Sequence, residues 1–333
     1  MKKKAERIIL AGDVGGSKTL LALFSPGLRG MRPLARAVFA SSEFPTLNAV
    51  LERFLAGRHP RLSAAAFGIA GPVHAGRVQA TNLPWHVNAF ALSRSLGGIP
   101  VRLLNDLEAL AWAVPGLRPR DLQAIHRGVP DDQGPRGIVA PGTGLGEAIV
   151  LKCPGGEQIL PSEGGHADFA PVDELQADLL AYLRPRFGHV STERVCSGGG
   201  IPNLYDFFKH SGRFPEPPWL AAKLAGGKDQ TPVIVQSGME GTSKICRATL
   251  ELFAAILAAE AGNLALKVLA SGGIYFGGGL PPRILPLLRS PSFADTFAAK
   301  GRFSKLLQRI PLRVITQPEA GLLGAARAGM EIL

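Results

Sequence analysis

The sequence contains few cysteines and few aromatic residues. Its three cysteines, Cys153, Cys196 and Cys246, are widely separated in the 333-residue chain, so they form neither a disulfide framework nor a Cys-x-x-Cys metal site. Aromatic residues make up only 7% of the chain, which is poor material for stacking on nucleic-acid bases. These shortages predict a cytoplasmic protein in a reducing compartment that does not bind nucleic acid.

Long hydrophobic runs are also missing from the sequence. No apolar run approaches the ~18 residues that a membrane span requires. An apolar stretch follows Lys2–Lys4, but Gly12 and Asp13 interrupt it after Ile8–Ala11, which is shorter than the ~7 residues of a signal-peptide core. We therefore expect no membrane association and a buried first strand.

Basic residues are in excess, with 37 lysines and arginines against 26 acidic residues and a formal net charge of +11. Such an excess is often found in proteins that bind polyanions. The basic residues are scattered, however, and they form no cluster beyond Lys2–Lys4. The expected partner is therefore a phosphate-bearing small molecule rather than nucleic acid.

Two halves of the chain open with the same pattern of an apolar strand, a glycine turn and a second apolar strand. The strands are Ile8–Ala11 and Leu20–Phe24 in the first half, and Gly137–Ala140 and Glu147–Leu151 in the second. Each pattern predicts a β-hairpin. The length of the chain allows two domains, each of roughly 100–200 residues.

Further strands and helices are predicted around these hairpins. Strands are expected at Ala64–Ala70 and Val101–Leu104, and helices at Leu107–Val114, Asp173–Arg184, Gly241–Leu269 and Gly321–Ile332. The stretch Ser211–Pro232, rich in proline, glycine and lysine, is expected to be a mobile excursion. The mixture of strands and helices predicts an α/β fold in which helices cover the sheets.

Three glycine-rich turns are suited to binding phosphate, because glycine lets backbone N–H groups approach phosphate oxygens closely. They are Gly12-Asp-Val-Gly-Gly-Ser-Lys-Thr19, Pro141-Gly-Thr-Gly-Leu-Gly146 and Ser271–Gly279. The first differs from a Walker A loop, since Ser17 separates the glycines from Lys18. Asp13 is a carboxylate that a plain hairpin turn does not need, and it is suited to holding Mg²⁺ directly or through water. Thr143 adds a hydroxyl group for a terminal phosphate.

With these turns the chain resembles the bacterial glucokinase family, of the sugar kinase/actin/heat-shock ATPase superfamily, over nearly its whole length. The resemblance rests on Gly12–Lys18, Thr81-Asn-Leu-Pro-Trp85, Leu104–Asp106, Gly142–Gly146, Ser162–His166, Glu193–Gly198 and Gly272–Gly279. It implies two α/β domains of the ribonuclease H-like actin/hexokinase ATPase type, with mixed sheets flanked by helices and an interdomain cleft. The expected bounds are 1–116 with 318–333 for the smaller domain, to which the last helix returns, and 117–317 for the larger.

The resemblance also implies ATP and Mg²⁺ as cofactors and glucose as the substrate, phosphorylated at its 6-hydroxyl. ATP is expected at Gly12, Asp13, Gly15, Gly16, Ser17, Lys18, Thr19, Gly142, Thr143, Gly144, Gly277 and Gly278, with Mg²⁺ at Asp13. Glucose is expected at Asn105, Asp106, Glu163, His166 and Glu193. Carboxylates accept hydrogen bonds from sugar hydroxyls, and the amide and imidazole groups supply donors. A homodimer is implied by the family alone.

Asp106 is the predicted catalytic base, since phosphoryl transfer needs one positioned carboxylate to take the hydroxyl proton. An alternative is that Asn105 or Asp106 only caps the following helix. Glu163 and His166 are separated by a glycine pair, expected to be flexible, which would let both side chains converge on one ligand.

Several of these residues have a second interpretation. His166 could be a structural histidine, and Glu193 could be a surface charge paired with Arg194. Lys18 could reach a phosphate or be an exposed turn residue. Asn82 and Trp85, despite their place in the resemblance, are expected to pack in a loop.

Other functions also stay open from the residues alone. A kinase for mannose or an amino sugar, or a non-catalytic sugar sensor, would use many of the same side chains, and polyphosphate could replace ATP as the donor. A DNA-binding repressor on this fold would need a helix-turn-helix segment first, and Asp13 lies too close to the N-terminus for one. A related kinase group carries a cysteine-rich zinc motif, which the three dispersed cysteines cannot form.

Overall fold

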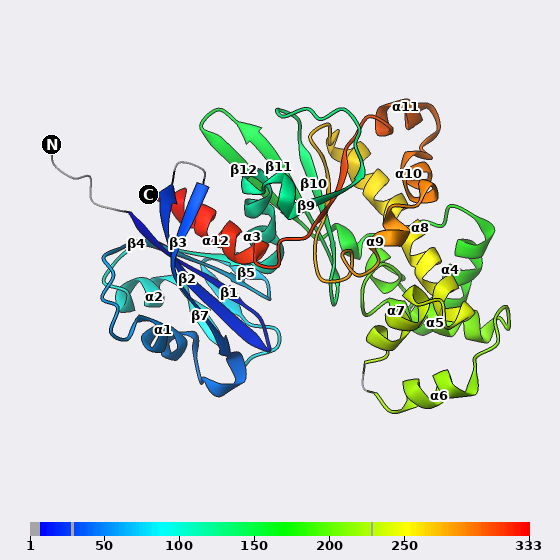
Figure 1. Cartoon of the computed structure of the whole chain (residues 1–333), viewed down its shortest axis with the longest axis horizontal. Coiled ribbons are helices and arrows are strands. Elements are labelled where there is room, and N and C mark those ends of the chain that lie inside the picture. The colour runs from blue at the N-terminus through cyan, green and yellow to red at the C-terminus, as the bar shows by residue number, and fades with distance from the viewer. Residues whose placement is uncertain (1–6, 28–29, 228) are drawn as a thin grey trace. The chain divides into compact units, whose positions relative to one another are not determined.

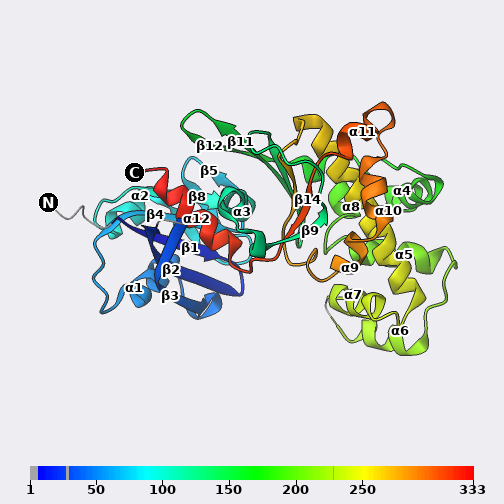
Figure 2. The same cartoon turned by 45° about the horizontal axis from the view of Figure 1, so that its top comes forward.

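The computed structural model describes residues 7–27, 30–227 and 229–333. The chain folds as two compact units, one made of the residues up to Arg118 together with Gln317–Leu333, the other of Pro119–Thr316. Each unit contains a mixed β-sheet flanked by helices (Figures 1 and 2). The predicted α/β fold class is confirmed, whereas the bounds given above for two domains stay a prediction.

The first unit contains a five-stranded sheet in the order β3-β2-β1-β4-β8. Its strands are β1 (Ile8–Val14), β2 (Lys18–Gly27), β3 (Gly30–Ala40), β4 (Leu62–Ile69) and β8 (Val101–Asn105), and a small second sheet is made of β5 (Val73–His74), β6 (Arg77–Gln79) and β7 (His86–Asn88). The pair β1–β2 is the predicted antiparallel hairpin, while β4 is parallel to both β1 and β8. The predicted buried first strand is β1, and Lys2–Lys4 lies outside the described residues.

Both faces of this sheet are covered by apolar helices, because alternate side chains of a strand point to opposite faces. On one face Leu10 and Leu21 pack in a cluster with residues of α1 (Leu47–Leu55) and α2 (Ala89–Ser95). On the other face Ala11 packs against α12 (Ala320–Met330). Figure 1 shows this last helix, in red, beside the blue first strands and beside α3 (Asp106–Ala113). The two ends of the chain thus share one core.

The second unit contains a six-stranded sheet in the order β12-β11-β10-β13-β14-β9. Its strands are β9 (Leu122–His126), β10 (Arg136–Pro141), β11 (Leu145–Cys153), β12 (Gly156–Ser162), β13 (Gly273–Phe276) and β14 (Leu312–Ile315). The pair β10–β11 is the second predicted hairpin, and β10, β13 and β14 run parallel. Polypeptide turns that follow β10 and β13 therefore lie at the same edge of the sheet.

The longest helix of the second unit lies in its core. The helices are α4 (Glu174–Phe187), α5 (Ile201–His210), α6 (Pro218–Ala225), α7 (Thr231–Met239), α8 (Lys244–Val268), α9 (Leu285–Leu288), α10 (Pro291–Ala298) and α11 (Ser304–Leu307). By length and composition α8 could cross a membrane, but 78% of its most apolar stretch is buried inside the protein. It packs against β10, α5, α7 and α10, so it is the central helix of this unit.

The stretch 211–232 differs from the mobile excursion that was predicted. It contains α6, which places Leu220 and Leu224 in the hydrophobic core. These two residues lie four positions apart, so they share one face of the helix. Three of the four prolines that suggested an irregular segment stand at helix starts, Pro217 and Pro218 at α6 and Pro232 at α7, where proline begins a helix instead of breaking it.

Candidate active site

The first glycine turn joins β1 to β2 and is supported by two buried hydroxyl groups. Ser41 Oγ donates to the carbonyl oxygen of Gly15 at 2.8 Å and lies 2.9 Å from Thr19 Oγ1. Both side chains are buried, so the Thr19 hydroxyl supports the turn from inside the fold. Ser17 and Lys18 are exposed at the other side of the turn.

Packing explains two of the glycines that were predicted to bind phosphate. Gly12 lies inside β1, where a Cβ would come within 2.5 Å of the Phe67 ring, and a Cβ on Gly16 would lie 2.6 Å from Asn82 Cβ. Trp85 is buried and donates its indole N–H to a backbone carbonyl at 3.1 Å. Trp85 is therefore a packing residue, whereas Asn82 is exposed and its expected packing role stays a prediction.

Asp13 and Asp106 influence each other in the first unit. Asp13 lies on β1 close to the start of α12, where a Cβ on Gly321 would be 3.2 Å from Asp13 Oδ2. Burial raises the pKa of Asp13 to about 6, with help from the charges of Asp106 and Glu319 and against the charge of Lys18. Sequence reasoning missed Glu319, although an acidic residue directly before the returning helix was a usable signal.

Asp106 begins α3, and Asn105 caps it. Asn105 Oδ1 accepts the backbone N–H of Glu108, so the capping role that the sequence left open belongs to Asn105. Asp106 Oδ1 accepts the backbone N–H of Leu107 at 3.0 Å, which orients the exposed carboxylate at the positive end of the helix. Although Asp106 is exposed at the surface, the protein atoms around its carboxylate partly desolvate it and raise its pKa, and its backbone hydrogen bonds oppose this effect. A carboxylate held in this way can accept a proton from a ligand hydroxyl.

The second and third glycine turns lie side by side in the second unit. Gly277, after β13, donates its N–H to the carbonyl oxygen of Val139 on β10 at 3.0 Å. Gly278 has φ of +84°, and a Cβ there would lie 2.9 Å from the carbonyl oxygen of Pro141, which directly precedes the second turn. Two of the three turns predicted to hold ATP are therefore adjacent.

Glu193 joins the second glycine turn to the segment 192–199. Its Oε2 accepts the backbone N–H of Leu145 at 2.9 Å and fills the space beside Gly144. Gly198 and Gly199 donate to the two carbonyl oxygens of the turn 142–143, at 2.7 and 3.1 Å. The turn thus depends on a predicted sugar residue for its position.

Glu163 and His166 face each other on the turn that follows β12. His166 Nε2 lies 3.9 Å from Glu163 Oε2, and the side chains are 61% and 85% exposed, which does not fit a buried structural histidine. The two glycines between them are close-packed rather than flexible, because a Cβ on Gly164 would overlap the carboxylate of Glu147 and one on Gly165 would overlap a β11 carbonyl. The turn therefore presents both side chains from a well-supported backbone.

Two further residues of the second unit, Arg194 and Glu147, neighbour the residues described above. The sequence left open a pairing of Glu193 with Arg194. Instead, Glu193 binds the glycine turn, and the Arg194 guanidinium makes a cation–π contact 4.4 Å from the centroid of the Phe187 ring. Glu147 is buried in β11 next to the turn 163–166. Sequence reasoning missed Glu147, and its signal was a carboxylate inside an otherwise apolar strand.

Comparisons with known proteins gave the following matches to the chain as a whole. A model of the glucokinase family matches residues 10–332. A glucokinase from Nostoc punctiforme is 37% identical over 96% of this chain and 98% of its own length, and one from Chromobacterium violaceum is 38% identical over 95% and 88%. The crystal structure of a glucokinase from an Antarctic psychrotroph is 31% identical, with a TM-score of 0.88 over 97% of this chain and 99% of that one. A ROK-family glucokinase from Streptomyces griseus, 21% identical over 97% and 99%, shares the fold with a TM-score of 0.62.

Proposed function

The chain belongs to the glucokinase family, and from this premise we propose that Asp106 is the base that accepts the proton of the glucose 6-hydroxyl. The family transfers the terminal phosphate of ATP to glucose. One observation carries the assignment of the base: Asn105 caps α3 and leaves the adjacent Asp106 carboxylate oriented and exposed. A carboxylate that is held in position but does not itself cap the helix suits phosphoryl transfer, because this reaction depends mainly on positioning and charge.

ATP is assigned to the glycine turns. In the second unit the adjacent turns 142–144 and 277–278 offer backbone N–H groups, and Thr143 adds a hydroxyl group. In the first unit the turn Gly15–Lys18 offers further N–H groups and an exposed lysine. The Streptomyces griseus protein was solved with glucose and AMPPNP, which supports nucleotide binding by this fold.

Asp13 fits a magnesium site because of its surroundings. Its pKa is raised by burial and by two neighbouring carboxylates, and a bound cation would offset both effects. Among the residues of the described ranges no cluster of three or more acidic, histidine or cysteine side chains could hold a metal ion. Asp13 would therefore be one protein ligand, with water and phosphate oxygens completing the shell, as Mg²⁺ prefers. When bound, the ion would neutralise charge on the phosphates.

Glucose is assigned to Asn105, Asp106, Glu163, His166 and Glu193. Glu163 and His166 offer an acceptor and a donor within hydrogen-bonding reach of neighbouring hydroxyls on one sugar ring. Glu193 uses Oε2 for the backbone of the glycine turn, so Oε1 is the oxygen assigned to the sugar. The Glu193 side chain would therefore bind the sugar and also support the glycine turn that is assigned to phosphate.

Glu193→Ala is expected to raise the KM for glucose and the KM for ATP together, each by about tenfold. Removing the carboxylate leaves the Leu145 N–H without its acceptor, and such a loss costs about 1–3 kcal/mol. Glu193→Gln is the matched control, because its amide oxygen can still accept this N–H. That variant should weaken glucose binding while the KM for ATP stays near the wild-type value. An unchanged KM for ATP in Glu193→Ala would argue against the shared role.

The proposed reaction is tested by coupled ADP release with MgATP and a panel of hexoses. Glucose should give the highest kcat/KM. A preference for mannose or an amino sugar would keep the mechanism and change the substrate. Sugar binding without ADP release would favour the alternative of a non-catalytic sensor.

Location and assembly follow the same proposal. Cys153, Cys196 and Cys246 are free thiols, which suits a reducing compartment, and we assign the protein to the cytoplasm. A homodimer is proposed from the family alone. Light scattering that gives the mass of a single chain would contradict it.

A further inference from the structure

Two buried carboxyl groups, those of Glu147 and Glu260, lie in the second unit, and that of Glu147 is next to the turn that carries Glu163 and His166. Glu147, on β11, is 1% exposed, and Glu260, on α8, is 7% exposed. In each of them Oε1 is buried and has no hydrogen-bond partner within the described ranges. A buried carboxylate oxygen without a donor is unfavourable, so the pair requires an explanation beyond packing.

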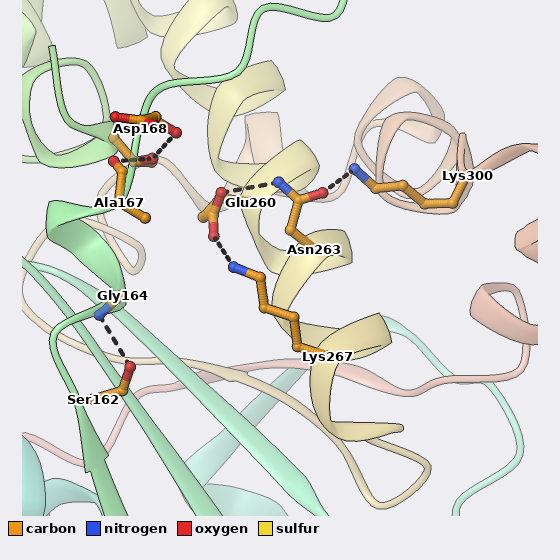
Figure 3. Close-up of polar contacts among 9 residues, drawn as sticks. Ser162, Gly164, Ala167, Asp168, Glu260, Asn263, Lys267 and Lys300 are labelled. Atoms are coloured by element: carbon orange, nitrogen blue, oxygen red, sulfur yellow. Dashed lines mark hydrogen bonds and ion pairs between the residues drawn. The ribbon is translucent and has the colours of Figure 1, made fainter.

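Glu260 is the member of the pair that has polar partners on its own helix. Its Oε2 accepts a hydrogen bond from the side-chain amide of Asn263 at 3.0 Å, and Lys267 Nζ lies 3.9 Å from its Oε1. Asn263 Oδ1 accepts in turn from Lys300 Nζ at 2.6 Å. Figure 3 shows Asn263 and Lys267 pointing toward Glu260, with Lys300 behind Asn263. Glu260 therefore has one nearby lysine, a direct amide donor, and a second lysine that is linked to it through that amide.

Glu147 is the member that retains a proton. Burial, followed by the charge of Glu260, raises the pKa of Glu147 to about 7, while Lys267 acts in the opposite direction. The charge of Glu260 acts on Glu147, so a neutral Glu147 avoids two like charges in one buried site. Burial and both carboxylates raise the pKa of the neighbouring Cys196 thiol, so this group stays neutral and contributes no charge.

Glu147 also contacts the sugar turn directly. It pairs with Ser162 across β11 and β12, and its Oε2 occupies the space beside Gly164 that a Cβ would need. The Gly164 N–H donates to Ser162 Oγ at 3.0 Å, as Figure 3 shows. Glu163 and His166 are the residues on either side of this close-packed glycine pair, so their positions depend on where the Glu147 carboxyl lies.

We propose that Glu147 is a positioning residue for glucose binding, whose buried carboxyl group, packed beside Gly164, holds the turn 163–166 in its sugar-binding position. The inference rests on the proposed sugar roles of Glu163 and His166. Ionisation of Glu147 places two carboxylates against each other in a buried site, and like charges at close range repel strongly there. The displaced carboxylate then moves the turn that packs on it.

The sign of the pH effect follows from the direction of the pKa shift. A carboxyl group with a raised pKa in the folded protein favours the fold while it is protonated. This contribution is lost as the pH rises from the ordinary range of glutamate through about 7. Glucose binds to the turn in its ordered position. The affinity of the protein for glucose should therefore fall as the pH rises from about 6 to about 8. A difference of one pKa unit between the free and the glucose-bound protein corresponds to about tenfold in affinity.

The experiment measures the glucose dissociation constant by calorimetry, and the KM values for glucose and ATP, at three pH values across this range. In the wild type the glucose constants should rise by about tenfold, and the KM for ATP should change much less. Glu147→Gln cannot ionise, so its glucose constants should stay within about twofold of each other across the range. Wild type and variant differ only at position 147, so the comparison isolates Glu147.

Two further variants keep the result decisive. Glu260→Gln should weaken the pH dependence, because Glu147 no longer faces a charge while burial still raises its pKa. Glu251→Gln removes a carboxylate from the exposed side of the same helix, where it pairs with Arg247, and should keep the wild-type profile. An identical pH dependence in wild type and Glu147→Gln would overturn the inference. A wild type that neither binds nor phosphorylates glucose at any pH would instead contradict the proposed function.

Discussion

Asp106→Asn is expected to lower kcat for glucose phosphorylation by about 10²-fold or more, with little change in the KM for glucose. Asparagine keeps the shape of the side chain and can still accept the N–H of Leu107 through its amide oxygen. It cannot take the proton of the 6-hydroxyl, so the loss should appear in the chemical step. Steady-state ADP release against glucose concentration, with calorimetry of glucose binding, separates the two quantities.

Glu108→Gln is the matched control for this variant. Glu108 is the other acidic residue in the first turn of α3, so its replacement removes the same charge from the same helix end. Such a change is worth about 1 kcal/mol at most, or roughly fivefold in rate. Equal losses in both variants would assign the effect to the helix terminus and remove Asp106 from the role of base.

Glu163→Gln is expected to raise the KM for glucose by about 10- to 100-fold, with a smaller effect on kcat. Hydrogen bonds to a charged acceptor contribute about 1.5–3 kcal/mol, and glutamine offers a neutral oxygen in place of the carboxylate. The side chain is 85% exposed, so the substitution should not disturb the fold. Glucose titrations at saturating ATP measure the effect.

Asp168→Asn provides the matched control on the same segment. Asp168 is 91% exposed and its Oδ1 lies 2.9 Å from His189 Nε2, so it carries the same charge without a proposed sugar contact. Its KM for glucose should stay within about twofold of the wild-type value, as expected for an exposed ion pair. A wild-type KM in Glu163→Gln would exclude Glu163 from the sugar site.

The hairpins and the main helices could be predicted because their signals are local. An apolar strand, a glycine turn and a second apolar strand identify β1–β2 and β10–β11, and both pairs have the expected antiparallel register. Apolar residues at helical spacing likewise identify α8 and α12. The helix α6 was missed because its composition suggested a loop, and only the burial of Leu220 and Leu224 in the core shows why it forms.

The candidate site was only partly readable from the sequence, because several roles depend on tertiary contacts. The glycine pair at Gly164 and Gly165 suggested flexibility, yet both residues are needed for close packing on β11. Thr19 looked suited to phosphate, yet its hydroxyl lies in a buried pair with Ser41. In both cases the residue that decides the role is distant in the sequence, so a local sequence pattern does not reveal it.

Charge interactions were the least predictable part of the site. The mutual effect of Asp13 and Asp106 depends on β1 and α3 meeting in one unit. The pairing of Glu147 with Glu260 similarly joins β11 to the core helix α8. In the sequence Asp13 and Asp106 were assigned roles separately, whereas Glu147 and Glu260 were visible only as acidic side chains in apolar segments.

A single-turnover measurement tests the central claim most directly. Enzyme in excess over glucose is mixed with saturating MgATP, the reaction is quenched, and glucose 6-phosphate is identified and quantified. The wild type should convert bound glucose in one fast phase, and Asp106→Asn should convert it about 10²-fold or more slowly at the same glucose occupancy. Conversion by Asp106→Asn at the wild-type rate would contradict the assignment of Asp106 as the base.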